Sequence, residues 1–317
     1  MMKKPLIVLT GPTAVGKTKL SIALAKAVGG EIISADSMQV YKYMNIGSAK
    51  IRPEEMDGVP HYLVDVLDPA DEFHIVKFQE MAKEAIEKIY ANGHIPILVG
   101  GTGFYIQAIV KDIDFTENEE NTEVRAKWEQ YAKDYGAEAL HAELEIIDPK
   151  SAEAIPAGNV KRVVRALEFY DLSGKRISEH NEEQKAKGSP YDFAYFVLND
   201  HRNLLYDRIE KRIDEMLEEG LVEEVQGLKD RGFTKNMVSM QGLGYKEILD
   251  YLEGNLTLEE AVYILKRDTR HFAKRQLTWF RREPEVSWIL KYEYGYDDEK
   301  ILDAMLGILK DKGILGE

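Results

Sequence analysis

The sequence predicts an α/β fold, in which helices flank a parallel sheet and a helical insertion divides the chain. Two observations carry this prediction. Short apolar runs alternate with helical patterns over roughly the first third of the chain, and such alternation is typical of parallel sheets. From about Asp112 to Ser189 helical patterns follow one another with no convincing strand. We therefore expect a core of residues 1–112 and 190–317, with residues 113–189 as an inserted helical domain.

The first strand, expected at residues 5–10, leads into a glycine-framed loop with the spacing G-x-x-x-x-G-K-T, and a helix is expected at 18–28. Two glycines let the backbone turn tightly, so that its N–H groups point at phosphate oxygens. Lys17 would add positive charge, and the Thr18 hydroxyl is suited to Mg²⁺. We predict a P-loop NTPase-like core whose diphosphate or triphosphate site comprises Gly11, Pro12, Thr13, Ala14, Val15, Gly16, Lys17 and Thr18.

The remaining core elements follow from the same patterns. Further strands are expected at residues 31–35, 61–66, 95–99 and 193–198. Helices are expected at residues 75–92, 202–229, 258–282 and 297–312. Ligands gather at the carboxyl ends of parallel strands. The polar segments 11–18, 36–39 and 100–103 should therefore converge on one crevice.

Composition limits the class of protein. The 317 residues include no cysteine, which excludes disulfides, thiolate nucleophiles and cysteine zinc sites and favours a reducing cytoplasm. No apolar run approaches the roughly 20 residues of a membrane helix, and the N-terminal run is too short for a signal peptide. The net charge is −14, from 42 basic and 56 acidic residues, which by itself argues against a nucleic-acid partner.

The distribution of charge indicates the opposite. Residues 266–282 hold seven basic side chains against one acidic side chain, Asp268. Their spacing of three or four residues gives one helix face a basic stripe interleaved with Phe272, Trp279 and Phe280. A solvated charged face is the usual explanation, but in an acidic protein a polyanionic partner explains the stripe better. Residues 161–165 form a second basic cluster.

Two further side chains each allow two interpretations. Asp36 follows a predicted strand and could act as a general base or hold Mg²⁺ through water, or it could simply cap a turn. Arg208 could clamp a diphosphate or lie on a helix surface. The strand at 95–99 ends in Gly-Gly where a Walker B strand would end in Asp, and no N-K-x-D motif occurs. These absences weaken the NTPase and GTPase interpretations.

Six segments together resemble the bacterial tRNA dimethylallyltransferase family, also called tRNA isopentenyltransferases. They are G-P-T-A-V-G-K-T at 11–18, S-A-D-S-M-Q-V-Y at 34–41, V-G-G-T-G-F-Y at 99–105, R-V-V-R-A-L-E at 162–168, G-L-G-Y-K-E at 242–247 and T-R-H-F-A-K-R-Q-L-T-W-F-R at 269–281. The resemblance covers nearly the whole chain, and the combination is far more specific than the phosphate loop. The absence of cysteine matches the short bacterial form, because eukaryotic relatives carry a zinc finger.

The resemblance implies transfer of a dimethylallyl group from dimethylallyl diphosphate to N6 of adenosine 37, which lies 3′ of the tRNA anticodon. It implies that Asp36 is the general base on N6 and that Thr18 coordinates Mg²⁺. Lys17, Arg208 and the loop amides would stabilise the leaving diphosphate. The phosphate loop would then hold the diphosphate of the prenyl donor and not ATP. This agrees with the absence of the Walker B aspartate that is typical of ATP-hydrolysing P-loop proteins.

The resemblance also implies a set of contacts with the tRNA anticodon stem-loop. They are expected from Asp36, Ser37, Met38, Gln39, Thr102, Arg125, Lys161, Arg162, Val163, Val164, Arg165, Arg270, Lys274 and Arg281. The adenosine would be extruded from its stack to reach the site. We expect a cytoplasmic monomer with no membrane partner. Three alternatives stay open: an adenylate isopentenyltransferase acting on free AMP, ADP or ATP, a P-loop small-molecule kinase, and an RNA-binding module that holds a structural phosphate.

Overall fold

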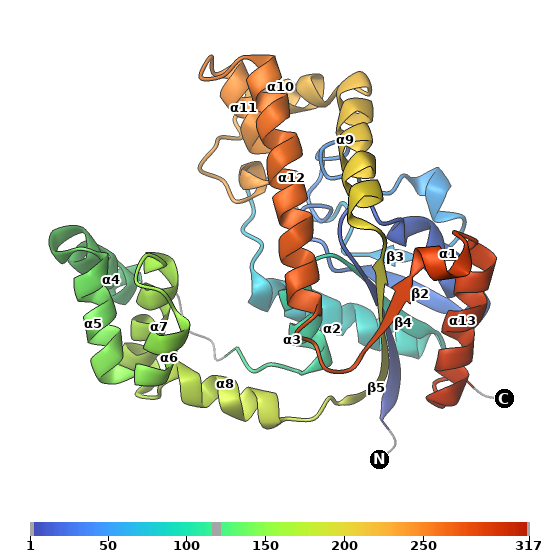
Figure 1. Ribbon diagram of the computed structural model, residues 1–317, viewed down its shortest axis with the longest axis horizontal. Coiled ribbons are helices and arrows are strands. Elements are labelled where there is room, and N and C mark those ends of the chain that lie inside the picture. The colour runs from blue at the N-terminus through green and yellow to red at the C-terminus, as the bar shows by residue number, and fades with distance from the viewer. Residues whose placement is uncertain (1–2, 116–121, 316–317) are drawn as a thin grey trace. The chain divides into compact units, whose positions relative to one another are not determined.

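The computed structural model of the chain describes residues 3–115 and 122–315. Within these residues six parallel strands form one sheet in the order β3-β2-β4-β1-β5-β6 (Figure 1). The strands are β1 (Lys4–Thr10), β2 (Gly30–Ser34), β3 (His61–Tyr62), β4 (Ile95–Gly100), β5 (Tyr191–Asn199) and β6 (Val286–Leu290). The predicted α/β fold with a parallel sheet is confirmed.

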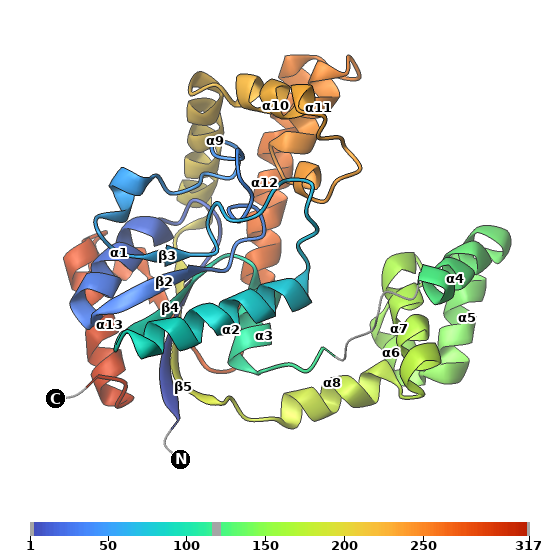
Figure 2. The same cartoon turned by 180° about the vertical axis from the view of Figure 1, so that it is seen from behind.

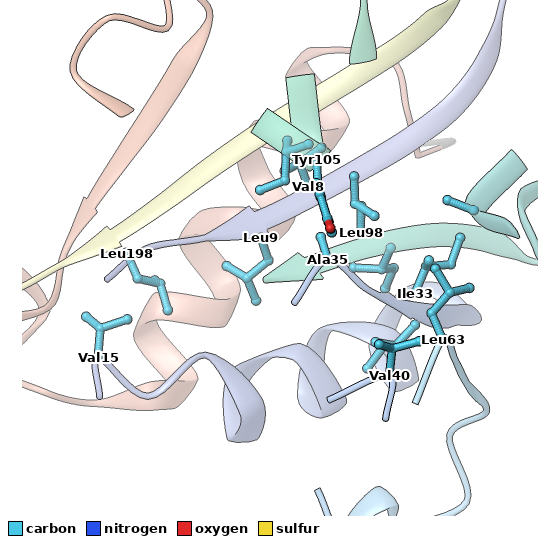
Figure 3. Packing of buried hydrophobic residues seen from close by; sticks show 14 of the residues in the cluster. Val8, Leu9, Val15, Ile33, Ala35, Val40, Leu63, Leu98, Tyr105 and Leu198 are labelled. Atoms are coloured by element: carbon cyan, nitrogen blue, oxygen red, sulfur yellow. The ribbon is translucent and has the colours of Figure 1, made fainter. Parts of the chain in front are cut away.

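The centre of the sheet is almost fully apolar. Leu6, Ile7, Val8 and Leu9 of β1 have no exposed surface, as expected for a strand covered on both faces. Figure 3 shows Val8 and Leu9 packed among side chains of β2, β4 and β5. The register sets Thr10 of β1 opposite the last residue of β4. The loops that follow these two strands therefore begin at the same level.

Helices cover both faces of the sheet. Helix α1 (Lys17–Val28) and helix α13 (Asp298–Asp311) lie on one face, and α2 (Ile75–Ala91) and α3 (Gly103–Val110) lie on the other (Figures 1 and 2). This arrangement follows from right-handed crossovers, because α1 connects strands in one direction across the sheet and α2 connects them in the other. Among the described residues, no helix is both long and apolar enough to cross a membrane.

Four helices between β5 and β6 build the rest of the core. They are α9 (Arg202–Glu218), α10 (Leu221–Asp230), α11 (Tyr245–Leu252) and α12 (Leu258–Phe280). Helices α9 and α12 lie side by side (Figures 1 and 2) and are joined by ion pairs from Arg270 to Glu210 and from Lys266 to Asp214. The helical stretch predicted at 202–229 is divided into two helices, because Gly220, with φ of 101°, interrupts it between α9 and α10.

The chain separates into two compact units, Met1–Val110 with Pro190–Glu317, and Lys111–Ser189. The described part of the second unit is helical: α4 (Thr122–Tyr135), α5 (Ala137–Ile147), α6 (Pro149–Ala154), α7 (Val160–Ser173) and α8 (Ile177–Ala186). It has its own apolar cluster, in which Trp128, Leu140 and Leu167 are buried. The acidic run at 117–120 lies outside the described residues.

Three further elements differ from the sequence prediction. The strand expected at 61–66 has only two residues, because the positive φ angles of Leu63 and Asp65 turn the chain away from the sheet. The edge strand β6 was not predicted, since its five mostly half-buried residues show no clear pattern. Helix α11 was also not predicted, because it has only eight residues and follows a glycine-rich segment.

A buried carboxylate lies at the amino end of the sheet, away from the loops just described. Glu31 of β2 accepts hydrogen bonds from the Tyr62 hydroxyl (2.6 Å), from Asn92 Nδ2 (3.1 Å) and from His94 Nδ1. Burial opposes ionisation of this carboxyl, but the hydrogen bonds from Tyr62, His94 and Asn92 outweigh burial and lower its pKa.

We expect Glu31→Gln to lower the free energy of unfolding by about 1–3 kcal/mol near neutral pH, because the amide leaves buried donors without an acceptor. The stability due to ionised Glu31 is complete above the pKa of the unfolded chain, about 4.3. It is lost as the pH falls through the lower pKa of the folded protein. Urea unfolding at neutral and acid pH tests this, with exposed Glu87→Gln as the control. If Glu31→Gln lowered the free energy of unfolding equally at both pH values, the prediction would be contradicted.

Candidate active site

The phosphate loop connects β1 to α1 in a conformation that depends on its glycines. Gly11 has φ of 147° and Gly16 has φ of 95°, which L side chains rarely adopt. A Cβ atom at Gly11 would lie 2.5 Å from the Leu198 carbonyl oxygen. Gly16 is the N-cap of α1, whose first backbone N–H groups have no partner within the helix. The loop and this helix end therefore have the geometry that the predicted anion site requires.

Lys17 lies beneath the loop and stabilises its fold. Its Nζ donates hydrogen bonds to the carbonyl oxygens of Gly11 (3.0 Å) and Pro12 (2.9 Å). Burial lowers the pKa of Lys17 to about 8, while Asp36 opposes this shift and Arg212 adds to it. A bound anion would favour the charged amine again, because opposite charge raises a lysine pKa.

Asp36 lies two residues after the end of β2, and its two carboxylate oxygens have different surroundings. Its Oδ1 accepts hydrogen bonds from the backbone N–H groups of Met38 (2.8 Å) and Gln39 (3.3 Å). Its Oδ2 has no hydrogen-bond partner among the described residues, and the side chain lines two adjoining cavities. Asp36 therefore caps a turn and still presents a carboxylate oxygen that can accept a proton.

The two cavities differ in character. The first, about 460 Å³, is the apolar cavity, and its walls include Phe73, Tyr105, Ile213, Leu265 and Phe272. The second, about 540 Å³, is the polar cavity, which is lined by the phosphate loop, Lys17, Thr18, Arg208, Lys211 and Arg212. Both cavities are lined by Thr13, Ala14, Asp36, Ser48 and Arg212. The arrangement fits a molecule with an anionic head and an apolar tail, whose junction lies beside Asp36.

Two arginines one turn apart on α9, Arg208 and Arg212, line the polar cavity. Arg208 Nη1 donates to Oδ2 of buried Asp200 (2.6 Å), which holds the guanidinium at the cavity wall. Arg212 lines both cavities, and burial lowers its pKa while Asp36 opposes this shift. Sequence reasoning selected Arg208 and missed Arg212. The spacing of four residues, which places both on one helix face, was the available signal.

The segments predicted to converge do so. Ser37, Met38 and Thr102 line the apolar cavity, and Gln39 and Gly100 line the polar cavity. The Gln39 amide accepts a hydrogen bond from Ser34 Oγ (3.3 Å) and donates one to the Ala49 carbonyl (3.2 Å). The ends of β1, β2 and β4 thus surround one site, as the parallel topology requires.

The cations of α12 have different surroundings. Arg270 is paired with Glu210 of α9, so part of its charge is already neutralised. Lys274 and Arg281 line a separate cavity of about 310 Å³, and neither has an ion-pair partner among the described residues. Lys274 on α12 and Arg281 at its C-cap are therefore the members of the predicted set in this region that keep uncompensated charge.

The predicted contact residues of the second unit fall into three groups. Lys161 and Arg162 are exposed at the start of α7. Arg125 and Arg165 both donate to the buried carboxylate of Glu168, at 3.1 and 3.0 Å. Val163 and Val164 belong to the apolar cluster of the unit and are at most 3% exposed. The structure corrects the expectation for these two side chains, which are core residues and support the helix that carries the cations.

A carboxylate that the sequence did not single out fixes a wall of the apolar cavity. Glu224 of α10 accepts hydrogen bonds from the backbone N–H groups of Asn45 (2.9 Å), Ile46 (2.8 Å) and Gly47 (3.1 Å). It also accepts one from the Tyr245 hydroxyl (2.8 Å). The motif G-L-G-Y-K-E thus supplies Tyr245, which packs against Gly47 so closely that a Cβ there would lie 2.7 Å from the ring.

Three comparisons with known proteins gave consistent results. The family model described as IPP transferase matches residues 39–283. A tRNA dimethylallyltransferase of Lachnoclostridium phytofermentans is 60% identical over 98% of this chain and 99% of its own length. The crystal structure of a Bacillus halodurans tRNA isopentenylpyrophosphate transferase has 45% identity and a TM-score of 0.73, covering 98% of each chain. A eukaryotic dimethylallyltransferase acting on tRNA has 30% identity and a TM-score of 0.76, over 90% of this chain and 74% of its own.

Proposed function

This chain belongs to the IPP transferase family, and we propose that it transfers a dimethylallyl group from dimethylallyl diphosphate to N6 of adenosine 37 in tRNA. The observation that carries the proposal is the junction of the two cavities at Asp36 and Arg212. The polar cavity fits the diphosphate and the apolar cavity fits the prenyl tail together with an extruded adenine. Diphosphate is the other product.

The reaction forms a bond from adenine N6 to C1 of the dimethylallyl group and breaks the bond from C1 to the diphosphate oxygen. The amine is a poor nucleophile, because its lone pair is delocalised into the ring. Asp36 accepts the N6 proton through its unpartnered Oδ2. Lys17, Arg208, Arg212 and the loop amides stabilise the charge that develops on the leaving diphosphate.

The proposal includes Mg²⁺. Among the described residues no group of three or more acidic, histidine or cysteine side chains could hold a metal ion alone. Mg²⁺ often binds through one or two protein ligands, water and the phosphates of the substrate. The Thr18 hydroxyl, with Asp36 in the same cavity, fits a metal that arrives with the diphosphate. Mg²⁺ would there neutralise negative charge on the leaving group.

We propose the tRNA anticodon stem-loop as the partner, held by the exposed cations of α12 and α7. The eukaryotic relative acts on tRNA, and Lys274 and Arg281 keep uncompensated charge here. We further propose that the protein works as a monomer, since the residues of one chain line both cavities. We also propose a cytoplasmic location, which a tRNA substrate supports.

One assay tests the proposal against its alternatives. Radiolabelled dimethylallyl diphosphate is incubated with tRNA, with free AMP and with neither. We expect label on tRNA alone. Label on AMP would select an adenylate isopentenyltransferase, and tRNA binding without label transfer would select an RNA-binding module. In a parallel incubation with radiolabelled ATP, phosphate transfer would select a kinase. Each of these results would overturn the proposal.

The affinity for tRNA should fall steeply with salt, since each neutralised phosphate contributes a slope of about −0.7 to −0.9 in log K against log salt. We expect Lys274→Met to weaken tRNA binding and to reduce the slope by about one phosphate. Lys310→Met, which removes an exposed lysine of α13, is the control and should leave both unchanged. Filter binding over a salt series measures the slope. A tRNA affinity of the unaltered protein that does not change with salt concentration would contradict the prediction.

A further inference from the structure

One buried side chain of α12 joins that helix to the phosphate loop. Gln276 is 6% exposed. Its Oε1 accepts a hydrogen bond from the Thr13 backbone N–H (2.9 Å), and its Nε2 donates one to the Gly101 carbonyl (3.0 Å). A single amide therefore connects the phosphate loop, the segment after β4 and the basic helix, which are far apart in the sequence.

The connection is closely packed, so it leaves little freedom for independent movement. A Cβ atom at Gly101 would lie 2.2 Å from Gln276 Nε2. One turn further along α12, Trp279 covers Gly103 in the same way, with 2.2 Å from a Cβ there to the Trp279 Cδ1 atom. The two glycines thus allow α12 to rest on the segment after β4, and Gln276 adds directional hydrogen bonds to that contact.

Several cations lie near Gln276 in the sequence. Lys274 and Arg275 come just before it, and Arg281, the C-cap of α12, follows one turn and a half later. Lys274 and Arg281 are the cations for which we proposed contacts with RNA phosphates. A force that fixes the position of α12 also fixes the Gln276 amide, and through it the Thr13 N–H and the shape of the phosphate loop.

We infer that Gln276 is a positioning residue that couples RNA binding on α12 to diphosphate binding in the phosphate loop. This inference rests on the proposed function, because it needs both ligands. RNA bound to α12 holds the phosphate loop in the shape that binds diphosphate. Diphosphate binding then loses less free energy to ordering of the loop. Coupling of this kind is reciprocal, and typical coupling factors are about 5- to 150-fold.

The test is a binding cycle on the full chain with inorganic diphosphate and an anticodon stem-loop RNA as probes. Calorimetry gives the diphosphate Kd without RNA and with saturating RNA, and the ratio of the two is the coupling factor. We expect a factor of at least about 5 for the unaltered protein. For Gln276→Met, which keeps the side-chain volume and removes both hydrogen bonds, we expect a factor near 1.

A matched control separates coupling from stability. Gln79 is another buried glutamine of the core, and its Nε2 donates to the Ala108 carbonyl (2.9 Å) outside both cavities. Gln79→Met should lower the melting temperature and keep the coupling factor of the unaltered protein. Gln276→Glu, which keeps an acceptor for Thr13 but places a carboxylate opposite the Gly101 carbonyl, should also lose the coupling.

The outcomes distinguish the inference from the proposed function. If the unaltered protein binds RNA and diphosphate without coupling, or if Gln276→Met keeps the full factor, the inference is wrong and the proposed function stands. If the unaltered protein binds neither probe, both are wrong. An equal loss of coupling in Gln79→Met would assign the effect to general destabilisation and would also overturn the inference.

Discussion

Replacing Asp36 with Asn is expected to reduce dimethylallyl transfer by about 10²- to 10⁴-fold, which is the usual contribution of a general base. Asparagine keeps the carbonyl oxygen that accepts the N–H groups of Met38 and Gln39, so the turn after β2 should persist. It cannot accept the N6 proton, because its amide is not basic. Diphosphate binding should stay near that of the unaltered protein.

The measurements are single-turnover transfer to tRNA and calorimetric binding of inorganic diphosphate. Asp68→Asn provides a matched control, since Asp68 Oδ1 also accepts a backbone N–H within its own turn, from Ala70 at 2.9 Å, and lies outside both cavities. This control should transfer at the normal rate. Asp36→Ala should lose transfer too, with added loss from the weakened turn. Near-normal turnover of Asp36→Asn would remove Asp36 from the role of base.

The parts of this site that the sequence predicts are those with local causes. The glycine spacing from Gly11 to Gly16 is set by the φ angles of one loop, and the observed angles of 147° and 95° fit that requirement. Parallel topology then places Asp36 beside this loop without any long-range detail. Local chemistry and one topological rule were therefore enough to predict that Asp36 lies beside the phosphate loop.

The residues that sequence reasoning missed have causes that are distant in the chain. From the sequence alone, Arg212 looks like an ordinary cation on a helix surface. Its interaction with Asp36 is visible only in the tertiary structure. Gln276 is a neutral amide within a basic run, and its role depends on Thr13, which lies 263 residues away. Val163 and Val164 were included because they lie between cations in sequence, whereas the helical period turns them into the core. Such pairings need the tertiary structure.

The close approach of β2 and β4 leads to a second large effect. A Cβ atom at Gly100 would lie 2.2 Å from the Ala35 carbonyl oxygen and 2.4 Å from its carbon. These are backbone atoms and cannot rotate aside. Gly100 is also held from its other side, because its carbonyl accepts the Thr10 hydroxyl at 2.6 Å. Gly100→Ala must therefore push apart the strand ends that carry Asp36 and the phosphate loop.

We expect Gly100→Ala to lower kcat/KM by about 10²-fold or more, because a displacement of about 1 Å can cost that much. Overpacking should also lower the free energy of unfolding by about 1–3 kcal/mol. The control is Gly227→Ala in α10, where a Cβ meets nothing within 4 Å. Gly227→Ala should raise the free energy of unfolding by about 0.5–1 kcal/mol and leave the rate of transfer unaltered. Denaturant unfolding fixes the folded fraction, so kinetics are compared per folded molecule. If Gly100→Ala transferred normally per folded molecule, the distance between these strand ends would not set the rate, and the geometric basis assigned to Asp36 would fail with it.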